Sequence, residues 1–318
     1  FFYAYKSQIE VLTDGGADII LIETIFDPLD AKAALLAARQ VFAEKNNEKP
    51  VMISVTITEK SGRTLSGQTL EAFINSVSHE NLFTLGLNCA LGPKEMYPFL
   101  EELSKKSSSY ISVYPNAGLP NEFGRYDQDP DTMSAYMKEF TDSGFVNIMG
   151  GCCGTTPDHI RLFAKIARQA KPHQPAQPEK KTRLSGLDAL TISKESNFIN
   201  IGERTNVAGS KKFSRLIREE KYEEAVSIAR NQVEGGAQIL DINVDAPLLD
   251  AKKAMSNFLN ILTADPDIAR HPVMLDSSDW EVVEAGLKCL QGKSIVNSIS
   301  LKNGEENFKQ LAGKIKTY

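Results

Sequence analysis

Short apolar runs alternate with longer amphipathic segments through the first half of the chain, from Gly16 to Ala170. The apolar runs are ADIILIET, PVMISVTI, LFTLGLNC, YISVYPNAG and VNIMGG. The segments of helical period that separate and follow them are PLDAKAALLAARQVFAEKNN, TLEAFINSVSH, PKEMYPFLEELSKK, DPDTMSAYMKEFTDSG and TPDHIRLFAKIARQA. Strands that are apolar on both faces, each followed by an amphipathic helix, are typical of a parallel sheet built from β/α repeats. The pattern predicts five such strands in this block.

The same alternation restarts after a polar interruption. This segment, KPHQPAQPEKKTRLSG at 171–186, contains three prolines and has no hydrophobic period before Leu187. Such a composition indicates an interdomain linker with an extended bias. Four further strands are predicted beyond it, at FINIGER, QILDINV, PVMLDS and SIVNSI. The sequence therefore predicts a first domain at 1–170, a linker at 171–197 and a second domain at 198–318.

Neither block has enough strands for a closed barrel, because a (β/α)8 barrel needs eight strands and about 250 residues. The first block also opens on a helical segment that leads into what has the pattern of an internal strand. We predict an α/β fold with two consecutive (β/α)8 TIM-type barrels, each only partly present. The chain would then be a fragment of a longer protein, with the C-terminal part of one barrel and the N-terminal part of the next. A doubly wound sheet is the alternative for either block, since β/α alternation does not separate the two folds.

Composition narrows the kinds of partner. The 318 residues are 42% hydrophobic and 24% charged, with a net charge of −5 and a pI near 5.6. This balance argues against nucleic acid or an anionic membrane and favours small molecules or proteins. No apolar run approaches the ~20 residues of a membrane span, and the first residues lack the features of a signal peptide. With only four cysteines and no secreted-module pattern, a reducing, cytoplasmic location is expected.

Three of the four cysteines fall where chemistry is expected in a β/α fold. Cys89 ends the run LFTLGLNC, and Cys152 and Cys153 directly follow VNIMGG. Active-site groups of (β/α) barrels lie at the C-terminal ends of the strands, so the three thiols should face one rim. The surrounding Gly150, Gly151 and Gly154 would let the backbone turn sharply there.

Converging thiolates in a reducing compartment suit Zn²⁺, and three protein ligands leave a coordination position for a substrate. Soft sulfur ligands favour a thiol substrate, which would bind deprotonated. The alternatives are buried free cysteines, a vicinal disulfide, or a structural zinc with a fourth ligand. His159 is predicted in the first turn of the next helix, after an N-cap at Thr156, and Cys289 is predicted mid-helix in the other block. Spacing alone leaves these possibilities open.

Longer motifs add a resemblance to a known family. GGCCGTTPDHI, with NCALGP and LIETIFDPLDAKAAL upstream, resembles the homocysteine-binding barrel shared by the cobalamin-dependent methionine synthases and the betaine–homocysteine methyltransferases. The likeness runs from Gly15 to about Ala170. It implies that Cys89, Cys152 and Cys153 bind Zn²⁺ and that the substrate is homocysteine.

Other polar positions of the first block have two interpretations each. The resemblance implies that Glu23 contacts the amino-acid end of homocysteine, whereas a rim salt bridge is the alternative. Asn88 and Asn116, at strand ends, are candidates for hydrogen bonds that support the site, or are turn residues. The loop SGRTLSGQT at 61–69 is polar and glycine-rich, but it lacks the spacing and lysine of a phosphate-binding P-loop.

Acids and amides recur at the strand ends of the second block. They are Glu203, Asn206, Asp241, Asn243, Asp245, Asp276 and Asn297, and the nearby basic compensation is Arg204. Each alone is explained by capping of the helix that follows. Four successive strand ends with such residues favour instead a pocket for a neutral heterocycle rich in N–H donors, such as a pterin.

The second block, from about Phe198 to Tyr318, resembles the pterin-binding barrel that follows the homocysteine barrel in the cobalamin-dependent methionine synthases. The resemblance implies that Glu203 (in GER), Asp276 (in MLDSS) and Asn297 (in IVNS) contact the pterin ring of 5-methyltetrahydrofolate. Asp241 and Asn243 should line the same pocket. A hydrogen bond from Asn297, or from a bound water, near N5 of the pterin is the hypothesis for how the methyl donor is activated. The betaine-dependent family has no such second barrel.

The tandem order implies an enzyme of methionine biosynthesis. A methyl group would pass from 5-methyltetrahydrofolate through methylcobalamin to zinc-activated homocysteine, giving methionine and tetrahydrofolate. Cobalamin-binding and reactivation domains are expected elsewhere on the same polypeptide, and this chain alone is expected to be inactive. The alternatives are a homocysteine methyltransferase with another donor, such as betaine, a non-catalytic pterin- or zinc-binding fragment, and an inert fragment that associates through its sheet edges.

Overall fold

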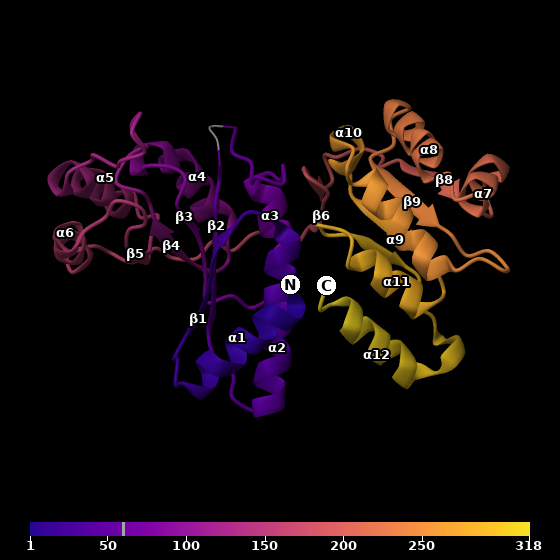
Figure 1. Cartoon of the computed structure of the whole chain (residues 1–318), viewed down its shortest axis with the longest axis horizontal. Coiled ribbons are helices and arrows are strands. Elements are labelled where there is room, and N and C mark those ends of the chain that lie inside the picture. Colours follow the sequence, from indigo (N-terminus) through magenta and orange to yellow (C-terminus); the bar gives the residue numbers. More distant parts are fainter. Residues whose placement is uncertain (59–60) are drawn as a thin grey trace. The chain divides into compact units, whose positions relative to one another are not determined.

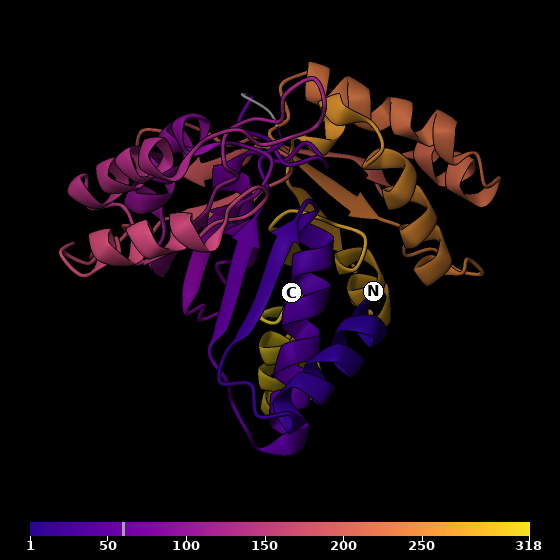
Figure 2. The same cartoon turned by 60° about the vertical axis from the view of Figure 1, so that its left-hand side comes forward.

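The computed structural model describes residues 1–58 and 61–318, which form two compact units (Figure 1). Unit 1 consists of Phe1–Ile74 and Glu80–Glu179, and unit 2 of Asn75–His79 and Lys180–Tyr318. Each unit has its own sheet, with helices along it in both views (Figures 1 and 2). The two are described in turn.

Unit 1 is built on a five-stranded parallel sheet. Its strands, in spatial order, are β1 (Ile20–Ile25), β2 (Val51–Val55), β3 (Thr84–Asn88), β4 (Tyr110–Tyr114) and β5 (Ile148–Met149). All neighbours pair in parallel, and the β1–β2 register shifts between Ile22 and Ile25. Sequence order and spatial order coincide, so every C-terminal strand end lies at the same edge of the sheet.

Helices precede and follow the strands of this sheet within residues 1–58 and 61–179. They are α1 (Phe2–Asp14), α2 (Pro28–Lys45), α3 (Leu70–Val77), α4 (Pro93–Lys106), α5 (Pro130–Asp142) and α6 (Pro157–Ala167). Capping residues set the first residue of α2: the Asp27 carboxylate accepts the Leu29 N–H at 2.8 Å, and Pro28 occupies the first helical position. The helix ends where Asn46 adopts a left-handed conformation. Fully buried side chains of both layers form the core, including Phe73, Phe140, Phe163, Ile53, Leu87 and Leu100.

Unit 2 has a four-stranded parallel sheet in the order β11-β10-β9-β8. The strands are β8 (Ile201–Asn206), β9 (Ile239–Asn243), β10 (Val273–Asp276) and β11 (Ile295–Asn297). The helices are α7 (Lys211–Arg218), α8 (Tyr222–Glu234), α9 (Ala251–Leu262), α10 (Pro266–Ala269), α11 (Trp280–Leu287) and α12 (Glu305–Ile315), with a 3₁₀ turn at Leu301–Asn303. Phe213 and Phe258 meet edge to face in the core, with ring centroids 5.1 Å apart.

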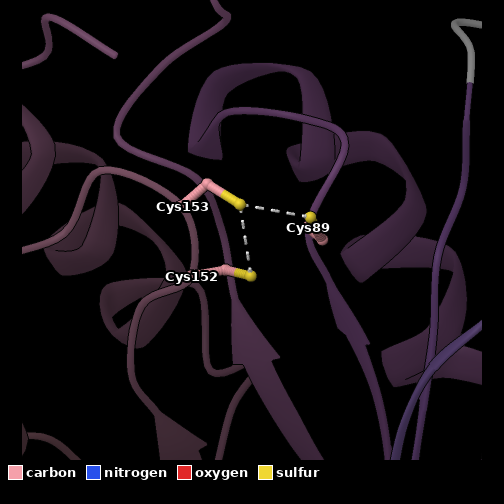
Figure 3. Close-up of side chains that lie close together, drawn as sticks. All are labelled: Cys89, Cys152 and Cys153. Atoms are coloured by element: carbon pink, nitrogen blue, oxygen red, sulfur yellow. Dashed lines mark hydrogen bonds between the residues drawn. The ribbon is translucent and has the colours of Figure 1, made fainter. Parts of the chain in front are cut away.

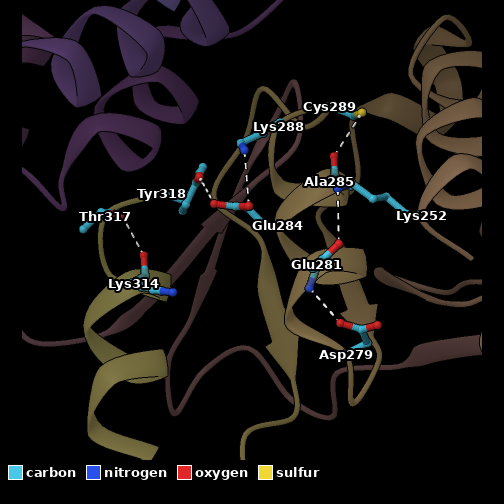
Figure 4. Close-up of polar contacts among 10 residues, drawn as sticks. All are labelled: Lys252, Asp279, Glu281, Glu284, Ala285, Lys288, Cys289, Lys314, Thr317 and Tyr318. Carbon is cyan, nitrogen blue, oxygen red and sulfur yellow. Dashed lines mark hydrogen bonds and ion pairs between the residues drawn. The ribbon is translucent and has the colours of Figure 1, made fainter. Parts of the chain in front are cut away.

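The last helix is held to α11 by polar and aromatic contacts (Figure 4). The Tyr318 hydroxyl donates to Glu284 at 2.8 Å, and Lys288 forms an ion pair with the same carboxylate. Burial, and then the hydrogen bond to Glu284, raises the pKa of Tyr318. Lys314 lies over the Trp280 ring, 5.7 Å from its centroid. These contacts fix the end of the described chain on unit 2.

The α/β prediction is confirmed, since the five and four predicted strands all occur as two successive sets of parallel β/α units. Neither sheet closes on itself within residues 1–58 and 61–318. No helix among these residues is both long enough and apolar enough to cross a membrane.

The segment predicted as a linker contains additional structure. Strands β6 (Thr182–Ser185) and β7 (Ala189–Ile192) pair as an antiparallel hairpin. The hairpin belongs to unit 2 because the Ser185 N–H donates to the Lys293 carbonyl at 3.1 Å, just before β11. The Leu187 N–H likewise donates to the carbonyl of Ala269. The residues that follow the prolines are therefore ordered by hydrogen bonds to the segments that lead into β10 and β11. The domain bounds 1–170 and 198–318 stay a prediction.

Candidate functional site

The structure brings three of the four thiols together at the C-terminal edge of the unit 1 sheet (Figure 3). Cys89 follows β3, and Cys152 and Cys153 follow β5. The Sγ atom of Cys153 lies 3.7 Å from that of Cys89 and 4.0 Å from that of Cys152, and all three sulfurs lie within 4.8 Å of one another. The side chains reach this point from strands that β4 separates in the sheet. The predicted convergence is thus present in the geometry.

Backbone hydrogen bonds hold the thiols in place. Cys89 has φ 61°, in the left-handed region that a non-glycine residue adopts only at a cost. Its N–H donates to the Tyr114 carbonyl at 3.1 Å, which ties the end of β3 to β4. The Cys152 N–H donates to the Pro115 carbonyl at 2.9 Å, and the Cys153 carbonyl accepts the Ala117 N–H. The last residue of β4 and the segment that follows it, residues 114–117, therefore support all three cysteines.

Two buried asparagines add side-chain support. Asn88 accepts the Thr24 N–H at 3.0 Å and donates to the Thr24 hydroxyl at 2.8 Å, which joins the ends of β3 and β1. Asn116 accepts the Cys153 N–H at 3.1 Å. Its Nδ2 is buried with no hydrogen-bond partner among the described residues. Of the two interpretations given to these residues, the hydrogen bonds favour support of the site.

His159 is accounted for without a ligand role. Its Nδ1 accepts the Thr156 N–H at 3.1 Å, as part of the N-cap of α6. The Nε2–H then donates to the Gln128 carbonyl at 3.0 Å. Because both ring nitrogens are engaged, His159 has no free lone pair for a metal. Cys289 lies in unit 2, just after α11 rather than within a helix, and its Sγ donates to the Ala285 carbonyl (Figure 4).

The donor set and spacing fit Zn²⁺. A tetrahedral zinc with Zn–S bonds of about 2.3 Å separates two ligating sulfurs by about 3.8 Å, close to the observed Cys89–Cys153 and Cys152–Cys153 distances. Burial, and then the neighbouring Cys89 thiol, raises the pKa of Cys152 to about 12. The Cys152 thiol therefore stays protonated unless a cation offsets the charge of its thiolate, and a bound metal ion would supply that charge. Cys89, Cys152 and Cys153 can hold a metal ion.

Two tyrosines that the sequence did not single out border the cluster. Tyr126 lies beside Cys153: burial, and then this thiol, raises the pKa of the Tyr126 hydroxyl. The ring of Tyr114 lies against Gly150, and its pKa is raised by burial and by the negative charge of Glu23. No local sequence signal identifies either residue, since each approaches the cysteines only through the fold.

Glu23 lies on the same edge, at the end of β1. The register shift between Ile22 and Ile25 is an irregularity in the β1–β2 pairing, and Thr24 within it has φ 59°. Glu23 is exposed and forms no ion pair within residues 1–58 and 61–318. The rim salt bridge weighed as its alternative role is thus absent from the described residues. The nearby loop 61–69 has internal hydrogen bonds, such as that from Arg63 to the Gly67 carbonyl at 2.7 Å, and its Ser66 hydroxyl donates to the Phe26 carbonyl at 3.1 Å.

Gly154 is the glycine that this geometry requires most clearly. It has φ +80°, and a Cβ added there would lie 2.3 Å from the Cβ of Tyr126 and 3.1 Å from that of Ala117. We expect Gly154→Ala to destabilise unit 1 by about 2–4 kcal/mol, because strain at positive φ adds to the clash. Gly124→Ala is the control, since Gly124 has φ +72° but open space around it, and should cost only about 1 kcal/mol. Equal losses in urea denaturation would show that the contact with Tyr126 does not matter.

The strand ends of unit 2 converge on one carboxylate. Asp276, at the end of β10, accepts hydrogen bonds from Asn206 (3.4 Å) and Asn243 (3.1 Å) on Oδ2 and from Asn297 (3.2 Å) on Oδ1. These three amides end the strands β8, β9 and β11. Asn206 also donates to Asp241 at 3.2 Å. Amides that merely capped helices would not share one acceptor, so the arrangement favours a polar pocket floor.

Two of the acids identified in the sequence, Asp245 and Glu203, have carboxylates that form no hydrogen bond with Asp276 or the amides around it within the described residues. Asp245 accepts both contacts of the Ser277 hydroxyl, at 2.9 Å, and so joins the loops after β9 and β10. Glu203 is exposed and makes no hydrogen bond to the Asp276 cluster, although its charge acts on Asp241. The β8–β9 register shifts between Gly202 and Thr205, which changes which side chains of β8 face the cluster.

Asp241 makes the stability of unit 2 depend on pH. Burial raises its pKa to about 6, against a hydrogen bond from Asn206 that lowers it. The folded protein therefore retains a proton that the unfolded chain loses near pH 4, and the free energy of unfolding falls as pH rises from about 4 to 6. We expect a loss of about 1 kcal/mol, after allowance for screening by water at the rim.

Asp241→Asn tests this dependence, because the amide is neutral at every pH and keeps an acceptor for Asn206. The variant should be as stable as the wild type at pH 4 and more stable at pH 7, as measured by chemical denaturation. Asp267→Asn, at a side chain that is 75% exposed, should leave the pH profile unchanged. A wild-type profile that is flat between pH 4 and 6 would contradict the raised pKa.

The geometry defines a class: an α/β protein with three thiols that could hold a metal ion at the edge of one parallel sheet, and a carboxylate held by three strand-end amides at the edge of another. Comparison with known families then places it. The chain belongs to the homocysteine S-methyltransferase family, which matches residues 1–167. Residues 202–318 match the family described as pterin binding enzyme. A homocysteine methyltransferase domain and a pterin-binding domain thus follow one another in this chain.

Solved structures give more distant likenesses. The homocysteine methyltransferase MmuM from Escherichia coli, in its apo form, is 20% identical with a TM-score of 0.39, over 52% of this chain and 57% of that one. The carboxyl transferase domain from Rhizobium etli pyruvate carboxylase, with pyruvate, is 13% identical with a TM-score of 0.22, over 86% of this chain and 44% of that one. The chain spans about half the length of these two proteins.

Proposed function

We propose that this chain is part of a cobalamin-dependent methionine synthase, which methylates homocysteine with a methyl group from 5-methyltetrahydrofolate. The observation that carries the proposal is the succession of two sites in one chain, a three-cysteine cluster followed by a pterin-binding domain. A betaine-dependent enzyme has no use for the second domain. The proposal includes two partial barrels, at 1–170 and 198–318, within a longer polypeptide.

In the first domain, Cys89, Cys152 and Cys153 would hold Zn²⁺. Zinc, when bound, supplies the positive charge that lowers the pKa of the homocysteine thiol, so that the substrate reacts as a thiolate. Glu23, exposed at the end of β1 with no ion pair among the described residues, is available to accept the ammonium group of the substrate. Asn88 and Asn116 keep the strand ends that carry these groups in register.

In the second domain, the polar floor would bind the pterin ring. Asp276 is fixed by Asn206, Asn243 and Asn297, so its carboxylate is oriented before a ligand arrives. A fixed carboxylate suits the adjacent N–H donors of a pterin, and Asp241 and Glu203 border it. Asn297 is the candidate for a hydrogen bond near N5, where protonation makes the tetrahydrofolate a better leaving group.

The remaining parts of the reaction lie outside these residues. The proposal assigns methylcobalamin to a cobalamin-binding domain of the same polypeptide, with a further domain for reactivation, and a cytoplasmic location that keeps the thiols reduced. Methionine and tetrahydrofolate are the products.

Equilibrium binding separates the proposal from its alternatives. The zinc-loaded chain should bind homocysteine and, independently, 5-methyltetrahydrofolate. Binding of homocysteine and of dimethylglycine, a betaine product, but not of the folate would favour a betaine-type donor instead. Removal of zinc should abolish homocysteine binding and leave folate binding intact, whereas unfolding on zinc removal would indicate a structural metal.

A further inference from the structure

Tyr114 stands at the centre of the strand ends that carry the three thiols. It is the last residue of β4, and β4 lies between β3, which leads to Cys89, and β5, which leads to the other two cysteines. In the parallel pairing of β4 with β5, Val113 is the partner of Met149, so Tyr114 lies beside Gly150. The carbonyl of Tyr114 holds Cys89 in place, and its side chain is half-buried. The phenol ring is therefore part of the surface next to the thiols.

The ring of Tyr114 occupies the room that a glycine leaves. A Cβ added at Gly150 would lie 2.8 Å from Cδ1 and 3.2 Å from Cε1 of the Tyr114 ring. The first of these distances is shorter than carbon atoms in a packed interior allow, so the ring reaches its position only because residue 150 has no side chain. The backbone at Gly150 supports one side of the ring, and the ring cannot retreat in that direction.

Tyr114 shares one face of the sheet with Glu23. A buried row of paired residues crosses the strands β1 to β4, and it consists of Ile22, Ile53, Leu85 and Ile111. Side chains alternate between the two faces of a sheet along each strand. Glu23 comes one residue after this row in β1, and Tyr114 three residues after it in β4, so both side chains point to the face opposite the row. Burial raises the pKa of Tyr114, and the negative charge of Glu23 raises it further, as expected of groups that share one space.

The proposed substrate must cross this space. The proposed function places its ammonium group at Glu23 and its sulfur on the metal at the thiols, so the carbon chain between them runs past Tyr114. An aromatic ring suits a methylene chain, because both are apolar and burial of each CH₂ group is favourable. A chain that is shorter by one methylene cannot reach both ends while it lies against a ring that Gly150 supports.

We propose that Tyr114 determines the chain length of the thiol that the site accepts, with its ring as the wall against which the two side-chain methylenes of homocysteine lie. The inference rests on the proposed function, because it takes the ammonium group and the sulfur of the substrate to be bound at Glu23 and at the zinc. Cysteine, which has one side-chain methylene, gives up either the Glu23 contact or the ring contact. Discrimination by one methylene in an apolar pocket is about 10- to 200-fold.

The test compares homocysteine with cysteine by titration calorimetry on the zinc-loaded whole chain, and the zinc content is measured after each titration. The wild type should bind homocysteine at least about tenfold more tightly. In Tyr114→Leu the wall recedes, and the preference for homocysteine should fall to about threefold or less. Tyr114→Phe keeps the ring without the hydroxyl and should keep the full preference. Tyr114→Met, which fills more of the volume, carries the same expectation as the leucine variant and decides the matter if that variant loses its zinc.

Tyr110→Leu is the matched control. Tyr110 begins β4 at the opposite end of the strand, where its ring meets Phe83 edge to face with the centroids 5.7 Å apart. This variant should keep the full preference for homocysteine.

Three results would overturn the inference while leaving the proposed function in place. They are an unchanged preference in a zinc-retaining Tyr114→Leu or Tyr114→Met variant, a preference that is lost in Tyr114→Phe, and equal affinity of the wild type for the two thiols. If the wild type binds neither thiol, the proposed substrate is wrong and the inference falls with it.

Discussion

Cys153→Ser is expected to lower the affinity of the chain for Zn²⁺ by at least about 100-fold and to abolish homocysteine binding. The Sγ of Cys153 is the one that lies close to both other thiols, at 3.7 and 4.0 Å. A serine hydroxyl keeps the shape but does not ionise near neutral pH, so zinc would lose one of three anionic sulfur ligands. If structural zinc binding of about 10–16 kcal/mol is shared among four ligands, each is worth about 3 kcal/mol, or two orders of magnitude.

Cys289→Ser separates this effect from a general loss of thiols. Cys289 is half-buried and donates to the Ala285 carbonyl, a bond that a serine hydroxyl can also make. The zinc content of the Cys289→Ser variant after dialysis against a weak chelator should equal that of the wild type. Similar zinc content in Cys153→Ser and Cys289→Ser would show that the cluster is not the metal site. Folate binding serves as the internal measure that unit 2 is intact in both variants.

Asp276→Asn is expected to weaken binding of 5-methyltetrahydrofolate by about 10- to 100-fold, the value of a hydrogen bond to a charged group. The wild-type carboxylate accepts from three amides, two on Oδ2 and one on Oδ1. An asparagine side chain has one oxygen and one NH₂ group in place of the two carboxylate oxygens. Its NH₂ group would therefore point at the NH₂ group of at least one of the neighbouring asparagines. The floor of the pocket would rearrange, and the acceptor offered to the pterin would be lost.

Asp279→Asn is the matched control for this change. Asp279 lies three residues further along and caps α11 by accepting the Glu281 N–H at 2.9 Å. Asparagine caps helices about as well as aspartate, so stability and folate affinity should both stay near the wild-type values. Isothermal titration of both variants gives the comparison. Wild-type affinity in Asp276→Asn would remove this residue from the pterin site.

The strands and their order were accessible from the sequence because the physical signal is local. Runs such as PVMISVTI and ADIILIET have apolar residues at successive positions, as expected of a strand that is covered on both faces. The common edge of Cys89, Cys152 and Cys153 followed from the rule that β/α units place strand ends together. The shared position of Asp276 and the neighbouring asparagines followed in the same way.

The contacts that complete each site were not accessible, because they join residues distant in sequence. Nothing near Tyr126 indicates that it lies beside Cys153, and nothing near Asn88 indicates its bonds to Thr24. The shift in strand register before Thr205 breaks the two-residue alternation, so the side of β8 on which Glu203 lies could not be derived from periodicity. The β6–β7 hairpin was hidden because strands of four residues follow a proline-rich segment and are ordered by pairing with unit 2.

The central claim is that three cysteines form a zinc site with a position for the substrate thiol. X-ray absorption at the zinc edge tests it most directly, because it counts the sulfur neighbours of the metal. We predict three sulfur neighbours in the zinc-loaded chain and four after addition of homocysteine. Four sulfurs before homocysteine is added, or a count that homocysteine does not change, would contradict a substrate-activating site.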